Sequence, residues 1–159
     1  MNDSSFLLST LDLLEAAGIQ VWVFGGWAEE LWGLIAPRHH QDVDFLFPAC
    51  DFTSVDRLLV VSPEMREIKA KRFLHKRAFL LENILVELIL AQSSGQPDGR
   101  YETNFFSSGY RFSWPQDTFG LTVFCFERTV RVASQSALQA YRERHAEIEA
   151  SYAALGGTK

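Results

Sequence analysis

The order of hydrophobic and polar positions along this chain switches between a helical and a strand-like spacing. Apolar residues recur every three or four positions over residues 5–17, which predicts a first helix. Ser4 or Ser5 can cap this helix, and Gly18 ends it. The run from Val21 to Phe24 is apolar throughout and rich in β-branched and aromatic side chains, which is typical of a strand buried on both faces.

A diglycine turn and a short helix come next. Gly25-Gly26 interrupts the strand, and from Trp27 the helical spacing of apolar residues returns until shortly before Pro37. In this helix we expect Glu29 and Glu30 to face outward. The pattern therefore predicts a helix that is entered directly from a turn.

Acidic and apolar residues then alternate from Asp42, and the run becomes wholly apolar up to Phe47, before Pro48. Alternation with a period of two is the pattern of a strand. If this segment is a strand, Asp42 and Asp44 project from the same face.

The rest of the chain shows the same two spacings. The predicted elements are a helix from Asp51 or Thr53 to about Leu59, strands over 73–81 and 84–90 with a tight turn at 82–83, a loop over 93–100, an irregular aromatic strand over 101–114, strands over 121–126 and 130–132, and a helix from Ser134 or Ser136 to about Leu155. This order favours an α+β fold, and we see no domain boundary, so we expect one domain over residues 1–159.

Composition and charge narrow the class of protein. The net charge of −5 argues against binding long nucleic acid through bulk charge, so nucleic acid is an unlikely partner. Cys50 and Cys125 show no zinc-site spacing and indicate a reducing compartment. The N-terminus lacks the basic residues of a secretory signal, and no apolar run reaches the roughly 18 residues of a membrane span. We expect a soluble, cytoplasmic protein that does not bind membranes.

The acidic strand offers a place for a metal ion. Two carboxylates two residues apart on a strand, Asp42 and Asp44, can bridge hard cations such as magnesium, which prefer oxygen ligands. A third carboxylate from a neighbouring strand would complete a two-metal site for phosphoryl or nucleotidyl transfer. Glu87, in the apolar run 84–90, is the candidate, and because burying an unpaired charge is costly, a cation should face it.

Plainer interpretations of these acids remain open. Glu87 could reach solvent at a sheet edge or pair with Lys71, Arg72 or Arg77, and the two aspartates could belong to a half-exposed strand. The diglycine strengthens the functional interpretation, because glycines between a strand and a helix let backbone N–H groups approach phosphate oxygens. A phosphate-binding turn and a metal-binding strand separated by one short helix are more specific than either feature alone.

These residues resemble a known superfamily. The succession of Gly25, Gly26 and Trp27, followed by Arg38, His40, Asp42 and Asp44 on the next strand, is similar to the nucleotidyltransferases related to DNA polymerase β, and among them to the small enzymes that modify aminoglycosides at the 2″ hydroxyl and lincosamides. The resemblance is specific over about residues 21–48 and looser to about residue 92, where Glu87 takes the place of the third carboxylate.

The resemblance implies the nucleotidyltransferase fold, a mixed β-sheet flanked by helices with a C-terminal helix. It also implies transfer of a nucleoside monophosphate from an NTP, most simply ATP, to a hydroxyl of a small molecule, with two Mg²⁺ ions. Carried over by position, Asp42 and Asp44 bind both metals, and Glu87 helps bind one of them or deprotonates the acceptor. Gly25 and Gly26 hold the triphosphate and Arg38 neutralises its charge. His40, which we count with them as a cofactor-binding candidate, is expected to orient the aspartates or the loop.

Two segments have no counterpart that we can align. The basic residues of 66–76 could contact triphosphate or an anionic acceptor, and a solvated strand face is the favoured interpretation. The aromatic residues of 101–114 could contact an acceptor or a second subunit, whereas Trp22, Trp27 and Trp32 are expected in the core.

Two further hypotheses stand beside small-molecule transfer. One is a toxin-like enzyme that modifies protein or tRNA, and the other is a non-catalytic nucleotide-binding relative. A homodimer is expected, because the chain is short for an enclosed acceptor pocket.

Overall fold

The computed structural model describes residues 1–106 and 108–156, which form a mixed α+β arrangement. In chain order the elements are α1 (Ser4–Ala16), β1 (Trp22–Phe24), α2 (Gly25–Leu31), β2 (Asp42–Pro48), α3 (Thr53–Val61), β3 (Arg66–Glu67), a short 3-10 helix η1 (Lys69–Lys71), β4 (Lys76–Leu81), β5 (Ile84–Ser93), β6 (Tyr101–Phe105), β7 (Tyr110–Ser113), β8 (Thr122–Cys125), β9 (Arg128–Arg131) and α4 (Gln135–Ala154).

One mixed sheet carries the fold. Its strands lie in the order β1-β2-β5-β4-β3, and β6 and β7 continue it from the far end of β5. β2 and β5 are parallel, whereas β1–β2, β3–β4, β4–β5, β5–β6 and β6–β7 are antiparallel. The parallel pair lies in the middle, so residues that are distant in sequence become neighbours there.

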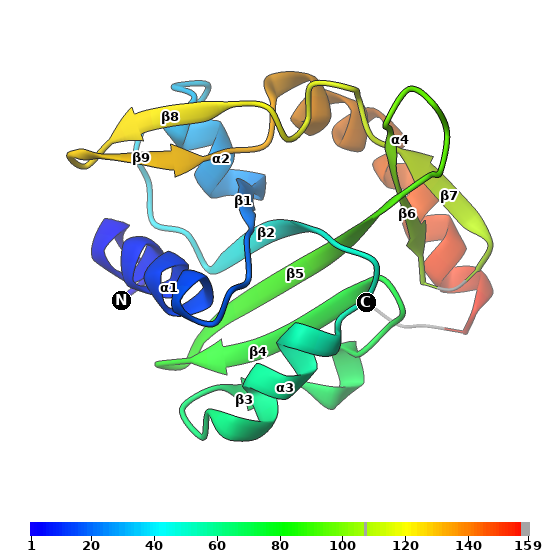
Figure 1. Ribbon diagram of the computed structural model, residues 1–159. Coiled ribbons are helices and arrows are strands. Elements are labelled where there is room, and N and C mark those ends of the chain that lie inside the picture. Colours follow the sequence, from blue (N-terminus) through cyan, green and yellow to red (C-terminus); the bar gives the residue numbers. More distant parts are fainter. Residues whose placement is uncertain (107, 157–159) are drawn as a thin grey trace.

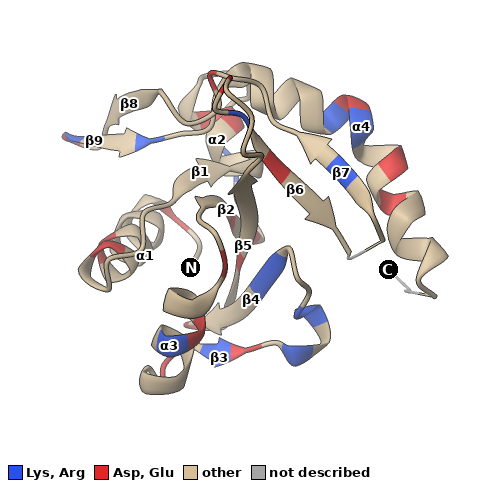
Figure 2. Cartoon of the chain, turned by 45° about the vertical axis from the view of Figure 1, so that its right-hand side comes forward, with Lys and Arg blue, Asp and Glu red and all other residues tan. Residues whose placement is uncertain are grey.

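Helices cover both faces of this sheet. In Figures 1 and 2, α1 and α3 lie on one side and α4 lies on the other, alongside the β6–β7 hairpin. The separate β8–β9 hairpin lies near β1, where Val132 forms a bridge with Val23. Side chains without exposed surface, such as Val23, Phe45 and Leu88, fill the core from three neighbouring strands. Burial of this apolar area is the main stabilising contribution to such a fold.

Most predicted elements are confirmed, including the order of helices and strands and the tight turn before β5. Glu82 and Asn83 have φ values of 51° and 63°, the left-handed conformation of a two-residue type I′ hairpin turn. The long aromatic strand expected over 101–114 is instead the hairpin of β6 and β7.

Several boundaries differ from the prediction for local reasons. The first helix is capped by Asp3, whose Oδ1 accepts the Phe6 N–H at 2.9 Å, so neither Ser4 nor Ser5 is the cap. α2 already begins at Gly25 and ends at Leu31, short of the predicted end. β4 begins at Lys76 rather than at residue 73 because a turn at residues 74–75 precedes it, across which Phe73 forms a bridge with Lys76. Within the described part of the chain, no helix has the length and apolar character needed to span a membrane.

Candidate active site

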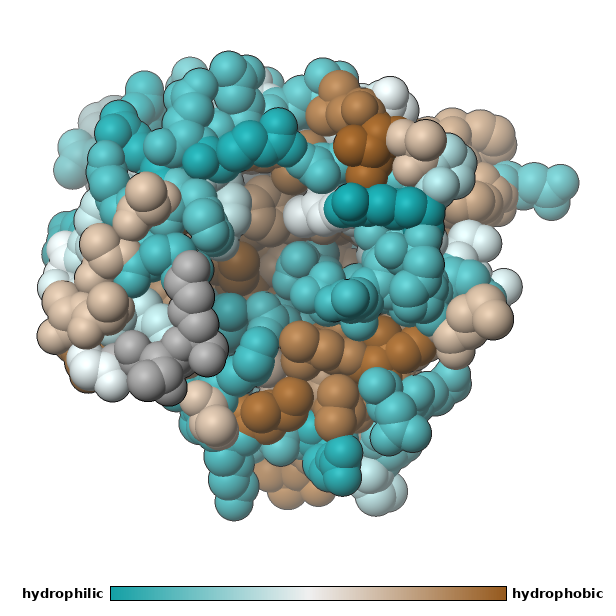
Figure 3. All heavy atoms as spheres, turned by 180° about the vertical axis from the view of Figure 1, so that it is seen from behind, coloured by the Kyte–Doolittle hydropathy of each residue, from teal (hydrophilic) through white to brown (hydrophobic). Residues whose placement is uncertain are grey.

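The sheet brings the three predicted carboxylates to one cavity. Asp44 and Glu87 are register partners on the parallel strands β2 and β5, and Asp42 lies on the same face two residues earlier. The cavity has a volume of about 440 Å³, and α4 forms its opposite wall. Its lining includes Gly25, Gly26, Arg38, Asp42, Asp44 and Glu87, which are six of the seven predicted site residues. Seen from the side opposite to Figure 1, the surface is hollowed near its centre, with many hydrophilic residues around the hollow (Figure 3).

Both glycines are required by close contacts at this corner. Gly25 has a φ of +63°, and a Cβ atom there would lie 2.5 Å from Oδ2 of Asp44. A Cβ atom on Gly26 would lie 2.9 Å from Nδ1 of His40 and 3.2 Å from Nη2 of Arg38. Since real Cβ contacts are longer, any larger residue at Gly25 would push the Asp44 carboxylate away. The diglycine therefore lets the first turn of α2 pack directly against the acidic strand.

His40 supports this corner from behind the cavity. Its side chain is buried, its ring lies 4.4 Å from the Trp27 ring between centroids, and its Nε2 lies 2.8 Å from Oε2 of Glu30. The other oxygen of Glu30 accepts the Arg38 N–H at 3.1 Å. Glu30 thus fastens the segment that carries Arg38 and His40 to α2. The expectation that Glu30 faces outward is wrong. His40 is not among the described residues that line the cavity, and its predicted role in orienting the loop stays a prediction.

Asp44 lies at the centre of the negative charge. The residue is half-buried, on the cavity side of β2. Burial, followed by the charges of Asp42 and Glu87, raises the pKa of Asp44 to about 7, although Lys76 and Lys71 act in the opposite direction. A divalent cation would remove this repulsion, so the local chemistry fits magnesium at the Asp42/Asp44 pair.

Glu87 is held by two lysines. Its Oε1 accepts from Nζ of Lys71 at 2.6 Å, its Oε2 accepts from Nζ of Lys76 at 2.9 Å, and only 8% of the residue is exposed. Burial raises the pKa of Glu87, but the two ammonium groups outweigh burial and hold the pKa below its usual range. The structure confirms that a cation faces Glu87, and for Lys71 it confirms the plainer interpretation of an ion pair within the protein. Arg72 and Arg77 pair instead with Asp56.

The basic segment 66–76 is therefore more than a solvated strand face. Lys71 and Lys76 belong to the Glu87 cluster, and Arg72 bridges Glu67 and Asp56 at 2.6 and 3.0 Å. Of the five basic residues singled out there, Arg66 and Lys69 are exposed as expected, and the described residues offer them no ion pair. Sequence reasoning did not single out Lys76 as a partner of Glu87. Its position two residues from Ala78, the register partner of Glu87, becomes visible only in the sheet.

The three carboxylates do not form a ready-made metal cluster. Across residues 1–106 and 108–156, no group of three or more His, Cys, Asp or Glu side chains is placed to hold a metal ion. Both oxygens of Glu87 are engaged by ammonium groups, whereas the described residues provide no ion pair for Asp42 or Asp44. The aspartate pair is thus the part of the donor set that suits a cation in this arrangement, and metal binding by Glu87 stays a prediction.

The wall formed by α4 was not predicted as part of the site. Leu138, Tyr141, Arg142 and His145 line the cavity from successive turns of this helix. Arg142 forms an ion pair with Glu29 of α2. Burial, and then the charge of Asp44, raises the pKa of the Tyr141 hydroxyl above its usual range, so it remains a hydrogen-bond donor at neutral pH. In the sequence, the helical spacing of residues 138, 141 and 145 indicates that they share one face of a helix. It does not indicate which part of the protein that face contacts.

Three of the six aromatic residues of 101–114 are buried, and Tyr101, Phe106 and Tyr110 are half-buried. Phe105, Phe112 and Trp114 are buried, and Phe112 and Trp114 meet edge-to-face with ring centroids 4.6 Å apart. Trp27 is buried as expected, and the Trp32 indole donates to the Ala133 carbonyl at 2.8 Å. These aromatic rings therefore serve mainly the core.

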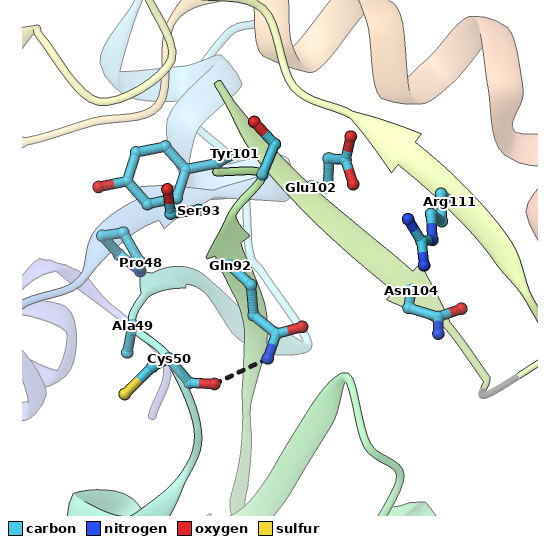
Figure 4. Close-up of a pocket in the computed structure, with 10 residues that line it drawn as sticks. Pro48, Ala49, Cys50, Gln92, Ser93, Tyr101, Glu102, Asn104 and Arg111 are labelled. Atoms are coloured by element: carbon cyan, nitrogen blue, oxygen red, sulfur yellow. Dashed lines mark hydrogen bonds between the residues drawn. The ribbon is translucent and has the colours of Figure 1, made fainter. Parts of the chain in front are cut away.

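A second, larger cavity lies at the far end of β2 and β5. It has a volume of about 540 Å³, and Figure 4 shows Gln92 in it donating to the Cys50 carbonyl, a contact of 2.7 Å. Glu102, Asn104 and Arg111 reach it from the β6–β7 hairpin. Among its described lining residues there is none of the predicted site residues. The larger of these two cavities is therefore not the one that contains the predicted site residues.

Comparisons with known structures agree with this fold. The fold is similar to that of the lincosamide antibiotic adenylyltransferase LnuA in its lincomycin-bound crystal structure, with a TM-score of 0.70 and 18% identity over 94% of this chain and 96% of that one. It is also similar to ANT(2″)-Ia in complex with adenylyl-2″-tobramycin, with a TM-score of 0.61 and 17% identity over 95% and 88% of the two chains. At these identities the likeness shows the fold.

The family is shown by the sequence itself. No curated protein matches the chain. The profile of the aminoglycoside-2″-adenylyltransferases matches residues 6–151, which contain the strand, the diglycine corner, the acidic pair and Glu87. This chain therefore belongs to the aminoglycoside-2″-adenylyltransferase family, a family of nucleotidyltransferases.

Proposed function

We propose that residues 1–159 act as one nucleotidyltransferase domain that, with two Mg²⁺ ions, transfers AMP from ATP to a hydroxyl of a small molecule of the aminoglycoside or lincosamide kind. One observation carries this proposal. The Asp42/Asp44 pair and the Gly25-Gly26 corner face the same cavity, with Arg38 beside them. A carboxylate pair next to the first turn of a helix suits a metal-bound triphosphate.

Each part of the cavity has a role in the proposed reaction. The backbone N–H groups at Gly25 and Gly26 bind phosphate oxygens, because the first turn of a helix leaves these donors without partners. Arg38 neutralises further phosphate charge. Asp42 and Asp44 hold magnesium, which when bound stabilises the charge on the attacking and leaving oxygens.

Glu87 serves the acceptor in this proposal. The acceptor hydroxyl oxygen forms a bond to the α-phosphorus, the bond from that phosphorus to its bridging oxygen breaks, and pyrophosphate leaves. The hydroxyl proton passes to the Glu87 carboxylate, which its lysines keep ionised and therefore able to accept it. Contact between Glu87 and one magnesium ion is the alternative role.

The acceptor class is supported by the comparisons. The structure of LnuA contains lincomycin, and that of ANT(2″)-Ia contains an adenylylated tobramycin. We extend to this chain the common feature, a hydroxyl-bearing small molecule. The free thiols Cys50 and Cys125 and the need for ATP support a cytoplasmic location. We further propose a homodimer, in which a second copy would narrow the open cavity.

Pyrophosphate release tests the proposal directly. Purified protein with ATP and an acceptor panel should release pyrophosphate only when magnesium is present, and Asp42→Asn and Asp44→Asn should each remove most of this activity. The control is Asp51→Asn, an exposed aspartate outside the cavity, which should leave the rate unchanged. Equal rates in the Asp42 and Asp44 variants and the wild type would overturn the mechanism.

The same assay separates the competing functions. Incubation with labelled ATP and cell extract, followed by separation by size, would reveal a toxin-like enzyme as label on protein or tRNA. Nucleotide binding without any labelled product would identify a non-catalytic relative. The proposed function requires the label on a small molecule.

A further inference from the structure

The buried side chain of Asn2 joins two parts of the protein that carry the proposed site. Its Nδ2 donates to the carbonyl oxygens of His40 at 3.0 Å and of Asp42 at 2.9 Å. Its Oδ1 accepts the Trp27 indole N–H at 3.1 Å. A carboxamide nitrogen carries two N–H donors, so both donors are in use. Only 5% of the residue is exposed, and a buried polar side chain with these bonds favours one arrangement of its neighbours.

Helix α1 keeps Asn2 in this place. The next residue, Asp3, caps the helix by accepting the Phe6 N–H, and Phe6 and Leu7 are buried in the core. Asn2 itself belongs to no helix or strand, so its position depends on this cap and on its own hydrogen bonds. The core therefore fixes Asn2, and Asn2 can fix the backbone that it contacts.

That backbone leads into the acidic strand. Residues 36–40 belong to no helix or strand, and β2 begins at Asp42. The two bonds that Asn2 donates hold the chain just before and at the point where it enters β2. Through the Trp27 indole, the same carboxamide joins this point to α2, the helix that begins with the diglycine.

Asp42 is held on one side and open on the other. Its carbonyl oxygen is bonded to Asn2, whereas its side chain lines the cavity and forms no ion pair with the described residues. The direction of its carboxylate therefore depends on how its backbone is held. Removing a group that orients a metal ligand typically lowers metal affinity about ten- to a hundredfold.

We propose that Asn2 is a positioning residue for magnesium, which aims the Asp42 carboxylate into the cavity by holding the carbonyls of His40 and Asp42. This inference rests on the proposed function and adds to it a residue outside the cavity. Asn2 is not among the described residues that line the cavity, so it acts through the backbone of β2.

Thr103 provides a matched control elsewhere in the sheet. It is also buried, and its Oγ1 accepts the Trp114 indole N–H at 2.8 Å and donates to the Leu90 carbonyl at 2.7 Å. These bonds are of the same kinds as those of Asn2, but none of the three residues lines the cavity of the acidic pair. Asn2→Leu and Thr103→Val remove the bonds with little change in size, so both should lower the melting temperature.

NMR titration with a non-hydrolysable ATP analogue separates positioning from general destabilisation. The affinity is measured with Mg²⁺ and again with a chelator, and the ratio of the two affinities gives the contribution of the metal. Asn2→Leu should lower this ratio about tenfold, whereas Thr103→Val should keep the wild-type ratio. Asn2→Ala provides the same test if Asn2→Leu does not fold. A wild-type ratio in the Asn2 variant, or an equal loss in Thr103→Val, overturns the proposal.

The indole N–H signals show whether each variant acts locally. Asn2→Leu should shift the Trp27 signal and leave the Trp114 signal in place, and Thr103→Val should do the reverse. A Trp27 signal that does not move in Asn2→Leu also overturns the proposal.

The wild-type protein distinguishes this inference from the proposed function. If Mg²⁺ does not strengthen binding of the analogue to the wild type, the proposed function fails and the positioning role falls with it. If Mg²⁺ strengthens binding equally in the wild type and in Asn2→Leu, only the positioning role fails.

Discussion

Asp44→Asn should make the metal-free protein more stable while removing its activity. The folded pKa of Asp44 is raised from 3.8 to about 7, so folding favours the protonated carboxyl. The stability associated with this group is fully present below the unfolded pKa of 3.8 and is lost as the pH rises to about 7. Asn imitates the protonated, neutral form at every pH, so the variant does not suffer this loss.

The magnitude follows from the pKa shift. Roughly three pKa units at about 1.4 kcal/mol each give an upper bound of about 4 kcal/mol at pH 8, and because Asp44 as a whole is only half-buried we expect about 2–4 kcal/mol. The difference in unfolding free energy between variant and wild type should be near zero at about pH 4. From there it should grow by up to about 1.4 kcal/mol per pH unit and level off above about pH 7.

Urea unfolding in the presence of a metal chelator, repeated across this pH range, measures the difference. Magnesium with an ATP analogue should narrow the difference, because ligands that bind only the folded wild type stabilise it. Asp42→Asn is the companion control. It removes the negative charge of Asp42, which repels the Asp44 carboxylate, and it changes a more exposed residue. A difference that does not change with pH, or a variant less stable than the wild type at about pH 8, would refute the reasoning.

Three other outcomes are expected. Gly25→Ala should lose activity, because its Cβ atom would lie 2.5 Å from the Asp44 carboxylate. Gly18 has a similar positive φ but open space around it, so Gly18→Ala should lose only about 1–2 kcal/mol of stability and keep its activity. Equal activities of the two variants would contradict this expectation. Burial lowers the pKa of His75 to about 3, so its imidazole should stay neutral on NMR titration down to about pH 4. A His75 pKa near 6.5 would contradict this expectation. Light scattering at micromolar concentration should give a dimer mass, and a monomer would count against the predicted homodimer.

Local patterns predicted the elements because their causes are local. The alternation from Asp42 to Phe47 has the period of two that is typical of a strand, and this segment is β2. The diglycine lies where β1 ends and α2 begins. The prediction that a cation must face Glu87 also succeeded, because the cost of burying a lone charge does not depend on the fold. These features were enough to predict that the acidic pair and the Gly25-Gly26 corner lie side by side.

What the sequence could not supply depends on contacts between distant segments. Lys76 reaches Glu87 only because β4 pairs with β5 in a particular register, and one-residue slippage would point it to the other face. Arg142 meets Glu29 across 113 positions of sequence. Similarly, the assumption that Glu30 faces solvent failed because the loop carrying His40 folds back on α2.

The most direct test of the central claim is a crystal structure with magnesium and a non-hydrolysable ATP analogue. The account predicts metal density between the Asp42 and Asp44 carboxylates, with the triphosphate against the backbone of Gly25 and Gly26 and within reach of Arg38. A triphosphate bound elsewhere, or one bound there without metal at the aspartate pair, would contradict it.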